Sequence, residues 1–248
     1  MFRRAALLNK LQKEFPHDFN PLRQCQKPVH VFIDNSNILI GFIDCIKARR
    51  GYKKPERVQR PSFSFFHFTI ILERSRPVAR KVLVGSLPYT PVIDEAKKLQ
   101  YKCDLLQKIE TEAPVELPKR KRAGSPSSGS DSPSTKNKKR VAKKEQGVDE
   151  VLNLKMCESI IDADVPGTLV LASGDGAIGE FSEGFLRTVE RALKKGWKVE
   201  LVTFSANISR SYTDKAFRRL WNRQFTIIHL DQYAEELLGT GSADSQEI

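Results

Sequence analysis

The chain has 248 residues, of which 40% are hydrophobic and 29% are charged, and its formal net charge is +12. These values are ordinary for a globular protein and exclude a chain that is disordered or fibrous throughout. No apolar run reaches the roughly 18 residues that a membrane-spanning helix needs, so we expect no membrane partner. The four cysteines stand far apart without a CxxC pair, which argues against zinc ribbons and disulfide scaffolds.

The first 27 residues read as an N-terminal extension. The stretch MFRRAALLNKLQKEF has amphipathic spacing and predicts a helix with Leu8, Leu11 and Phe15 turned towards the domain. A mitochondrial presequence is the alternative, because this stretch carries basic residues and no acid before Glu14. The absence of serine argues against it.

Residues 28–238 alternate strand-like and helix-like patterns. Strands are expected at 29–33, 81–84, 104–109, 168–172, 199–204 and 226–230, and helices at 38–48, 63–73, 92–101, 149–161, 185–194 and 208–221, with a short final helix. This alternation predicts one α/β domain, a three-layer Rossmann-like sandwich with a mostly parallel sheet. The small, polar residues 239–248 are expected to be a flexible tail.

A basic segment interrupts this domain. Residues 113–146 contain no aromatic residue, four Pro and six Ser, so we expect a disordered insert. Ten Lys/Arg and one acid lie in 119–144, a local charge of +9 that leaves only +3 for the rest. The two basic clusters, 119–122 and 136–144, resemble a bipartite nuclear localisation signal, which predicts an import receptor as partner and a nuclear, or nuclear and cytoplasmic, protein. A basic tether or phosphate-binding arm is the alternative.

Three acids follow or precede predicted elements at one edge of the sheet. Asp34 ends the first strand, Asp175 follows the strand 168–172, and Asp149 opens the helix after the insert. Ligands of open α/β sheets sit outside the carboxyl ends of the strands. Converging carboxylates repel one another unless a cation intervenes, and a hard divalent ion such as Mg²⁺ prefers oxygen ligands. Two of these acids also have an ordinary interpretation, as a helix N-cap or first-turn acid for Asp149 and as a turn residue for Asp175, whereas Asp34 abruptly ends an apolar strand.

A glycine pattern overlaps these acids. Gly174, Gly176 and Gly179 spell G-x-G-x-x-G between a strand and a helix, with Glu200 further on, as in a dinucleotide-binding turn. Asp175 would place a carboxylate beside the pyrophosphate, and Glu200 falls in the middle of its strand. Both features argue against dinucleotide binding.

Basic residues of the late helix are candidate substrate contacts. Arg210 and Lys215 precede the run FRRLWNR, in which basic and aromatic residues alternate as they do where single-stranded bases stack. For the aromatic side chains Tyr212, Phe217 and Trp221 we favour a place in the core, as on an amphipathic helix.

The segments VFIDNSNILIG, GVDEVLNLKMCESI and TLVLASGDG together resemble the NYN domain, a LabA-like branch of the PIN-like ribonuclease superfamily, and are most similar to fungal NYN-domain proteins. The resemblance covers most of residues 28–238. It implies a PIN-like fold with a metal-dependent ribonuclease site. The metal-binding and catalytic acids would be Asp34, Asp149 and Asp175. Asn35, Asn37 and Ser173 would support them.

Two acids of the family pattern are missing. Ala177 stands where the turn after the late strand usually has a second Asp, and Lys155 stands where the helix often has another. Lys155 would either bind the scissile phosphate or repel the metal.

We therefore expect a nuclease that hydrolyses RNA with Mg²⁺ or Mn²⁺. The alternative is an RNA-binding or scaffold domain whose catalysis is impaired, and dinucleotide binding is the least favoured interpretation.

Overall fold

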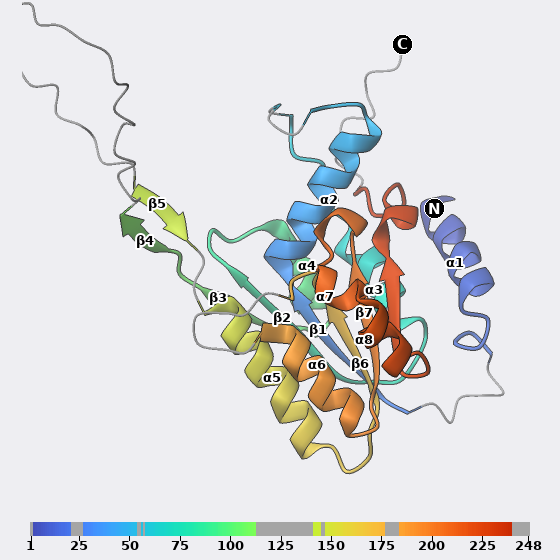
Figure 1. The fold of residues 1–248 in the computed structure, drawn as a ribbon. Helices are drawn as coiled ribbons and strands as arrows, with labels where there is room; N and C mark the ends of the chain where they lie inside the picture. Colours follow the sequence, from blue (N-terminus) through green and yellow to red (C-terminus); the bar gives the residue numbers. More distant parts are fainter. Residues whose placement is uncertain are drawn as a thin grey trace, which may run out of the picture.

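The computed structural model describes residues 2–20, 27–53, 56, 58–112, 141–144, 147–176 and 184–239. Within these ranges six strands form one all-parallel sheet in the order β3-β2-β1-β6-β7-β8, flanked by helices (Figure 1). The predicted α/β class and three-layer sandwich are confirmed. No helix in the described part of the chain has the length and apolar character that would let it cross a membrane.

The first half of the chain forms the three strands of one half of the sheet, in the order β3-β2-β1. Its elements are α1 (Phe2–Glu14), β1 (Val29–Asp34), α2 (Asn35–Arg49), α3 (Phe65–Glu73), β2 (Val78–Ser86), α4 (Pro91–Lys98) and β3 (Lys102–Leu106). In α1, Leu7 and Leu11 are fully buried, whereas Leu8 is half-buried. The helix thus packs on the domain with Leu11 and Phe15 inward as predicted, but Leu7 and not Leu8 is the fully buried residue of its first half.

The second half of the chain forms the other three strands, in the order β6-β7-β8. Its elements are α5 (Val148–Asp162), β6 (Thr168–Ala172), α6 (Gly184–Lys194), β7 (Lys198–Thr203), η2 (Ser205–Asn207), α7 (Arg210–Thr213), α8 (Lys215–Leu220), β8 (Phe225–His229) and η3 (Leu230–Tyr233). The single helix predicted at 208–221 is wrong. Asp214 has an extended backbone there, and its Oδ1 accepts a hydrogen bond of 2.9 Å from the Phe217 amide, which starts α8.

The predicted insert is partly structured. The strand β4 (Ile109–Glu112) pairs antiparallel with β5 (Val141–Lys144). Within the segment 113–146, residues 141–144 therefore form a strand. Local composition does not show this pairing, because it depends on a strand on the far side of the insert. The remaining residues of the expected disordered segment, the import signal within them and the tail 240–248 lie outside the described residues.

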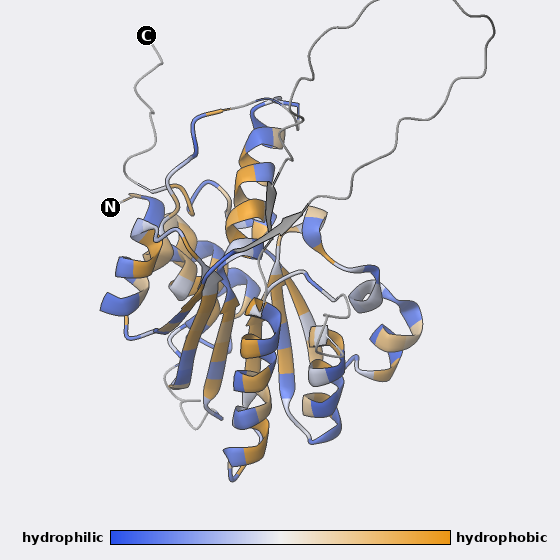
Figure 2. Cartoon of the chain, turned by 90° about the vertical axis from the view of Figure 1, so that its left-hand side faces the viewer, coloured by the Kyte–Doolittle hydropathy of each residue, from blue (hydrophilic) through white to orange (hydrophobic). Residues whose placement is uncertain are grey.

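Hydrophobic side chains cover both faces of the sheet. In β1, Val31 and Ile33 pack towards α2 and α3, while Phe32 packs towards α5 and α6. This alternation follows from the two-residue repeat of a strand. In Figure 2 the strands are largely orange, and the helices carry orange and blue sides.

A buried ion cluster joins the two halves. Glu200 of β7 accepts hydrogen bonds from Arg74 at 2.6 Å and from Arg76 at 2.8 Å, and Asp18 accepts one from Arg74 at 2.6 Å. The Arg74 side chain is fully buried. Burial by itself would raise the pKa of Glu200, but the two guanidinium groups hold this pKa below its ordinary value.

Removing one partner of this cluster should be costly. We expect Glu200→Gln to lower the free energy of unfolding by about 3–5 kcal/mol, because Asp18 alone would then face the two buried guanidinium groups of Arg74 and Arg76. Glu190→Gln removes the partner of the exposed Arg187 and should change stability by less than about 1 kcal/mol. Urea denaturation of both variants measures the difference, and equal effects would contradict the prediction.

His30 is buried in β1 behind α5. Its Nδ1 lies 3.1 Å from Ser159 Oγ, and its ring meets the edge of Trp197 at 5.0 Å between centroids. Arg80 of the neighbouring strand also donates to Ser159. Burial, followed by the charge of Arg80, lowers the pKa of His30 below its ordinary 6.5.

Folding therefore favours neutral His30, so the unfolded chain binds the extra proton as the pH falls through about 6.5. We expect this contribution to stability to be fully present above this pH and to decline as the pH falls below about 6.5 towards the lowered pKa of His30. His30→Gln should flatten that decline in urea denaturation measured across this range. An unchanged slope would assign the pH dependence to other groups.

Candidate functional site

The strand order reverses between β1 and β6. From β1 the chain adds β2 and β3 on one side, and from β6 it adds β7 and β8 on the other. Such a reversal opens a crevice at the carboxyl ends of the two central strands, where open α/β sheets bind ligands. Asp34 ends β1, and Ser173 directly follows β6, so both lie at this point.

Asp34 links the first strand to the helix after it. Its side chain is buried, with the residue 5% exposed, and Oδ1 accepts a hydrogen bond of 3.1 Å from the Asn37 amide as the N-cap of α2. Oδ2 accepts a hydrogen bond of 3.2 Å from Ser173 Oγ. One carboxylate therefore orients the start of α2 and the loop after β6 together.

The loop after β6 is held at both ends. Ser173 Oγ accepts the amide of Asp175 at 3.2 Å, and Asn37 Oδ1 accepts the amide of Gly174 at 2.9 Å. The Gly174 carbonyl accepts the Ser209 amide at 2.8 Å. The loop thus has a fixed backbone, in which Asp175 is half-buried beside Asp34 and Ser173.

Gly174 is required by close packing. A Cβ at this position would lie 2.3 Å from the carbonyl oxygen of Asn207 and 2.6 Å from Thr203 Oγ1. The turn after β7 therefore presses against the loop backbone. At β2, a Cβ on Gly85 would lie 3.1 Å from Asn35 Cβ, so the missing side chain makes room for buried Asn35.

Tyr212 supports the loop from α7. Its hydroxyl donates to the Asp175 carbonyl at 3.1 Å, and its ring stacks on Phe225 with the centroids 6.0 Å apart. Burial, and then the charge of Asp175, raises the pKa of Tyr212. Tyr212 and Phe217 are buried, as the core interpretation predicts. Pattern reasoning missed the contact between Tyr212 and the site, because nothing in the sequence links it to Asp175.

Asp149 lies on α5, at the same edge of the sheet. The contact between His30 and Ser159 fixes how α5 runs along β1. Asp34 stands four strand residues beyond His30, about 13 Å, and Asp149 stands ten helix residues before Ser159, about 15 Å. Asp34 also shares the sheet face of Phe32, which α5 covers. Asp34 and Asp149 therefore lie at about the same height along the strand direction, on the same face of the sheet.

The described residues contain no group of three or more His, Cys, Asp or Glu that could hold a metal ion. The three predicted acids thus share an edge of the sheet but do not form a three-acid metal cluster in this part of the chain. The donors at the switch point are nevertheless oxygens. Such a set fits Mg²⁺ or Mn²⁺ bound through one or two carboxylates, with a substrate phosphate completing the ligands.

The predicted substrate-binding cations are placed differently. Lys155 forms an ion pair with Glu158 at 3.0 Å, and Glu158 also pairs with Arg80. This pair lies towards the opposite end of β1, because Arg80 is aligned with His30 and not with Asp34.

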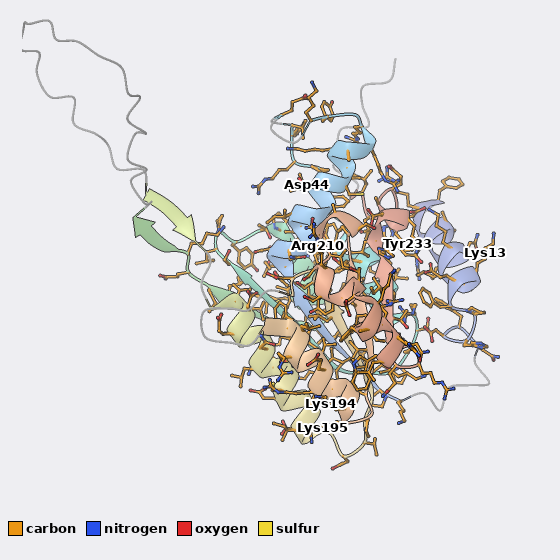
Figure 3. The ribbon with its side chains drawn as sticks, viewed as in Figure 1. Lys13, Asp44, Lys194, Lys195, Arg210 and Tyr233 are labelled. Carbon is orange, nitrogen blue, oxygen red and sulfur yellow. The ribbon has the colours of Figure 1, made fainter. Side chains whose placement is uncertain are left out.

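Arg210 and Lys215 are exposed at the starts of α7 and α8. In Figure 3, Arg210 lies near the start of α2, whereas Lys194 and Lys195 lie at the other end of the molecule. Arg210 follows Ser209, whose amide binds the Gly174 carbonyl. Of the predicted substrate-binding cations, Arg210 is therefore the one that adjoins a residue in contact with the loop after β6.

The geometry opposes dinucleotide binding. Glu200 is engaged by Arg74 and Arg76, and it pairs in register with Val170 within the sheet instead of standing at a strand end. The Gly174 amide is already bound to Asn37, and α6 begins only at Gly184. Gly179 lies outside the described residues.

Comparison with known protein families finds none that matches this chain. Comparison with curated proteins likewise finds no similar sequence. The resemblance to NYN domains therefore stays a prediction based on the motifs.

The double role of Ser173 can be tested by stability. We expect Ser173→Ala to lower the free energy of unfolding by about 1–3 kcal/mol, because its hydroxyl is the buried partner of both Asp34 and the Asp175 amide. Ser211→Ala, half-buried on α7, is a matched control and should change it by less than about 0.5 kcal/mol. Thermal or urea denaturation decides, and two equal values would argue against the linking role.

Proposed function

We propose that this protein is a divalent-metal-dependent ribonuclease whose active site is the switch point between β1 and β6. The observation that carries the proposal is the hydrogen-bonded unit of Asp34, Ser173 and the Asp175 loop at that point. Buried polar groups at a strand-end crevice are typical of ligand sites in open α/β sheets. The motif resemblance supports RNA as the substrate.

Each residue of the unit has a separate task in this proposal. Asp34 and Asp175 hold Mg²⁺ or Mn²⁺, with Asp149 level with Asp34 as a further carboxylate. Ser173 keeps the Asp34 carboxylate and the Asp175 backbone in one orientation. Asn37 accepts the Gly174 amide and so holds the start of the loop against α2. The ion, when bound, activates water and offsets charge on the phosphate oxygens.

Cations supply affinity for the RNA backbone. The formal charge of +12 favours a polyanionic partner; Arg210 and Lys215 are exposed, and Arg210 directly follows Ser209, whose amide binds the Gly174 carbonyl. Lys155 is not among the proposed contacts, since Glu158 and Arg80 engage its part of α5.

A second candidate is an RNA-binding domain that does not cleave. The lack of a three-acid group among the described residues favours it, together with Lys155 at a position where the family often has an acid. Both candidates predict RNA binding, and they differ in metal-dependent cleavage.

The test is cleavage of labelled single-stranded RNA in Mn²⁺, Mg²⁺ or EDTA. Asp34→Asn keeps the helix cap, because Asn caps as well as Asp, but it removes the charge that holds the ion. We expect this variant and Asp175→Asn to lose at least about a hundredfold in cleavage rate, because an ion at the reacting phosphate contributes several kcal/mol.

Asp162→Asn, an exposed change at the end of α5, should cleave like the wild type. Cleavage that EDTA does not abolish, or that persists in Asp34→Asn, would contradict the nuclease proposal. RNA binding without any cleavage would establish the non-catalytic candidate instead.

A further inference from the structure

A cavity separate from the switch point opens at the carboxyl edge of the sheet, between the end of α2 and the turns after β7 and β8. Its volume is about 390 Å³, enough for a nucleoside, and its lining includes Asp44, Tyr52, Phe204 and Asp231. Phe204 is fully buried and forms an apolar floor, whereas 44% of Tyr52 is exposed. In Figure 3, Asp44 lies on α2, away from the strands.

The charged groups of this cavity are not equally available. Arg49 donates to the Asp231 carbonyl and pairs with Glu235 at 3.5 Å, and Lys47 donates to the Glu56 carbonyl at 2.8 Å. Asp231 Oδ2 accepts the amide and the hydroxyl of Ser205, both at 2.8 Å.

Among the described residues, the side chains of Asp44 and Tyr52 have no hydrogen-bond or ion-pair partner, whereas the Tyr52 amide donates to the Lys47 carbonyl at 3.0 Å. A carboxylate beside an exposed aromatic ring is therefore what the cavity offers to a ligand. Arg50 and Lys53 flank Tyr52 in the sequence and are exposed just beyond α2, so they form a basic rim on the Tyr52 side of the cavity.

These groups match one nucleobase in particular. A carboxylate has two adjacent acceptor oxygens, and guanine alone among the RNA bases presents two adjacent N–H donors on its Watson–Crick edge, at N1 and N2. Adenine, cytosine and uracil each set acceptors beside a single donor position. Unpaired RNA bases are bound by stacking on aromatic rings together with hydrogen bonds to this edge.

We propose that this cavity binds an unpaired guanine of the RNA, with Asp44 accepting N1–H and N2–H and Tyr52 stacking on the base. The basic rim then meets the neighbouring phosphates. The proposal rests on the function proposed above and adds a base preference to it. The turn Ser205–Asn207 connects the two sites, because Asn207 donates to the Asn37 carbonyl at 3.4 Å and Ser205 binds Asp231.

An arginine side chain of a protein partner offers similar donors. The chain is basic both in the segment 119–144, at +9, and in the remainder, at +3, which disfavours a cationic partner and favours a polyanion, so RNA is the occupant we select. Asp44 stands ten helix residues from Asp34, about 15 Å, so one short single strand can reach both sites.

The test measures binding in EDTA, so that cleavage plays no part. Labelled oligouridylates carrying one central guanine, inosine or adenine are titrated with the full chain by fluorescence anisotropy. We expect guanine to bind about tenfold or more tightly than adenine, because a bidentate pair discriminates by at least this factor, with inosine between them because it lacks the N2 amino group. Asp44→Asn should abolish the preference, and Asp162→Asn should keep it. Tyr52→Ala should weaken binding of all three RNAs about equally.

Equal affinity for guanine and adenine, or a preference that survives Asp44→Asn, would overturn the proposal. Competition with guanosine 5′-monophosphate and with arginine amide separates the two occupants, since displacement by arginine amide alone would identify a protein-binding cavity. A guanine preference in a protein that never cleaves RNA would retain this inference and reject the nuclease.

Discussion

The hydrogen bond from Ser173 Oγ to Asp34 Oδ2 is the interaction on which the site depends. It joins the ends of β1 and β6, the two strands at which the order of the sheet reverses. A carboxylate buried at this place needs partners, because an unpaired charge in the interior is strongly disfavoured. The amide of Asn37 and the hydroxyl of Ser173 meet that need and at the same time fix the start of α2 and the loop carrying Asp175.

A second polar group holds the scaffold elsewhere. The cluster of Arg74, Arg76, Asp18 and Glu200 connects the end of α3 with β7, two elements that are far apart in the sequence. Because Glu200 is committed to this cluster, the glycine-rich loop after β6 has no ribose-binding acid. The same carboxylate that stabilises the fold thus removes one functional alternative.

The fold was more predictable than the site. Apolar runs located all six strands of the sheet, most clearly the central strands β1 and β6, where burial at every position leaves a continuous signal, and Asp34 stood out where such a run ended. The helix predicted at 208–221 broke at Asp214, since a side-chain cap competes there with helix continuation. The pairing of 109–112 with 141–144 was not predictable, because it joins segments on either side of the insert. The burial of Leu7 in place of Leu8 depends on how α1 packs on the domain.

The sequence by itself determined the α/β class, the order of its elements and the candidate acids, because periodicity and strand-end polarity are local properties. Tertiary structure alone decided which of these residues meet. It directs Lys155 to Glu158, brings Asp149 level with Asp34, and presses Gly174 against the turn after β7. It also leaves Asp44 and Tyr52 together in a cavity. Such encounters depend on helix direction and strand register, which set distances between residues far apart in the chain.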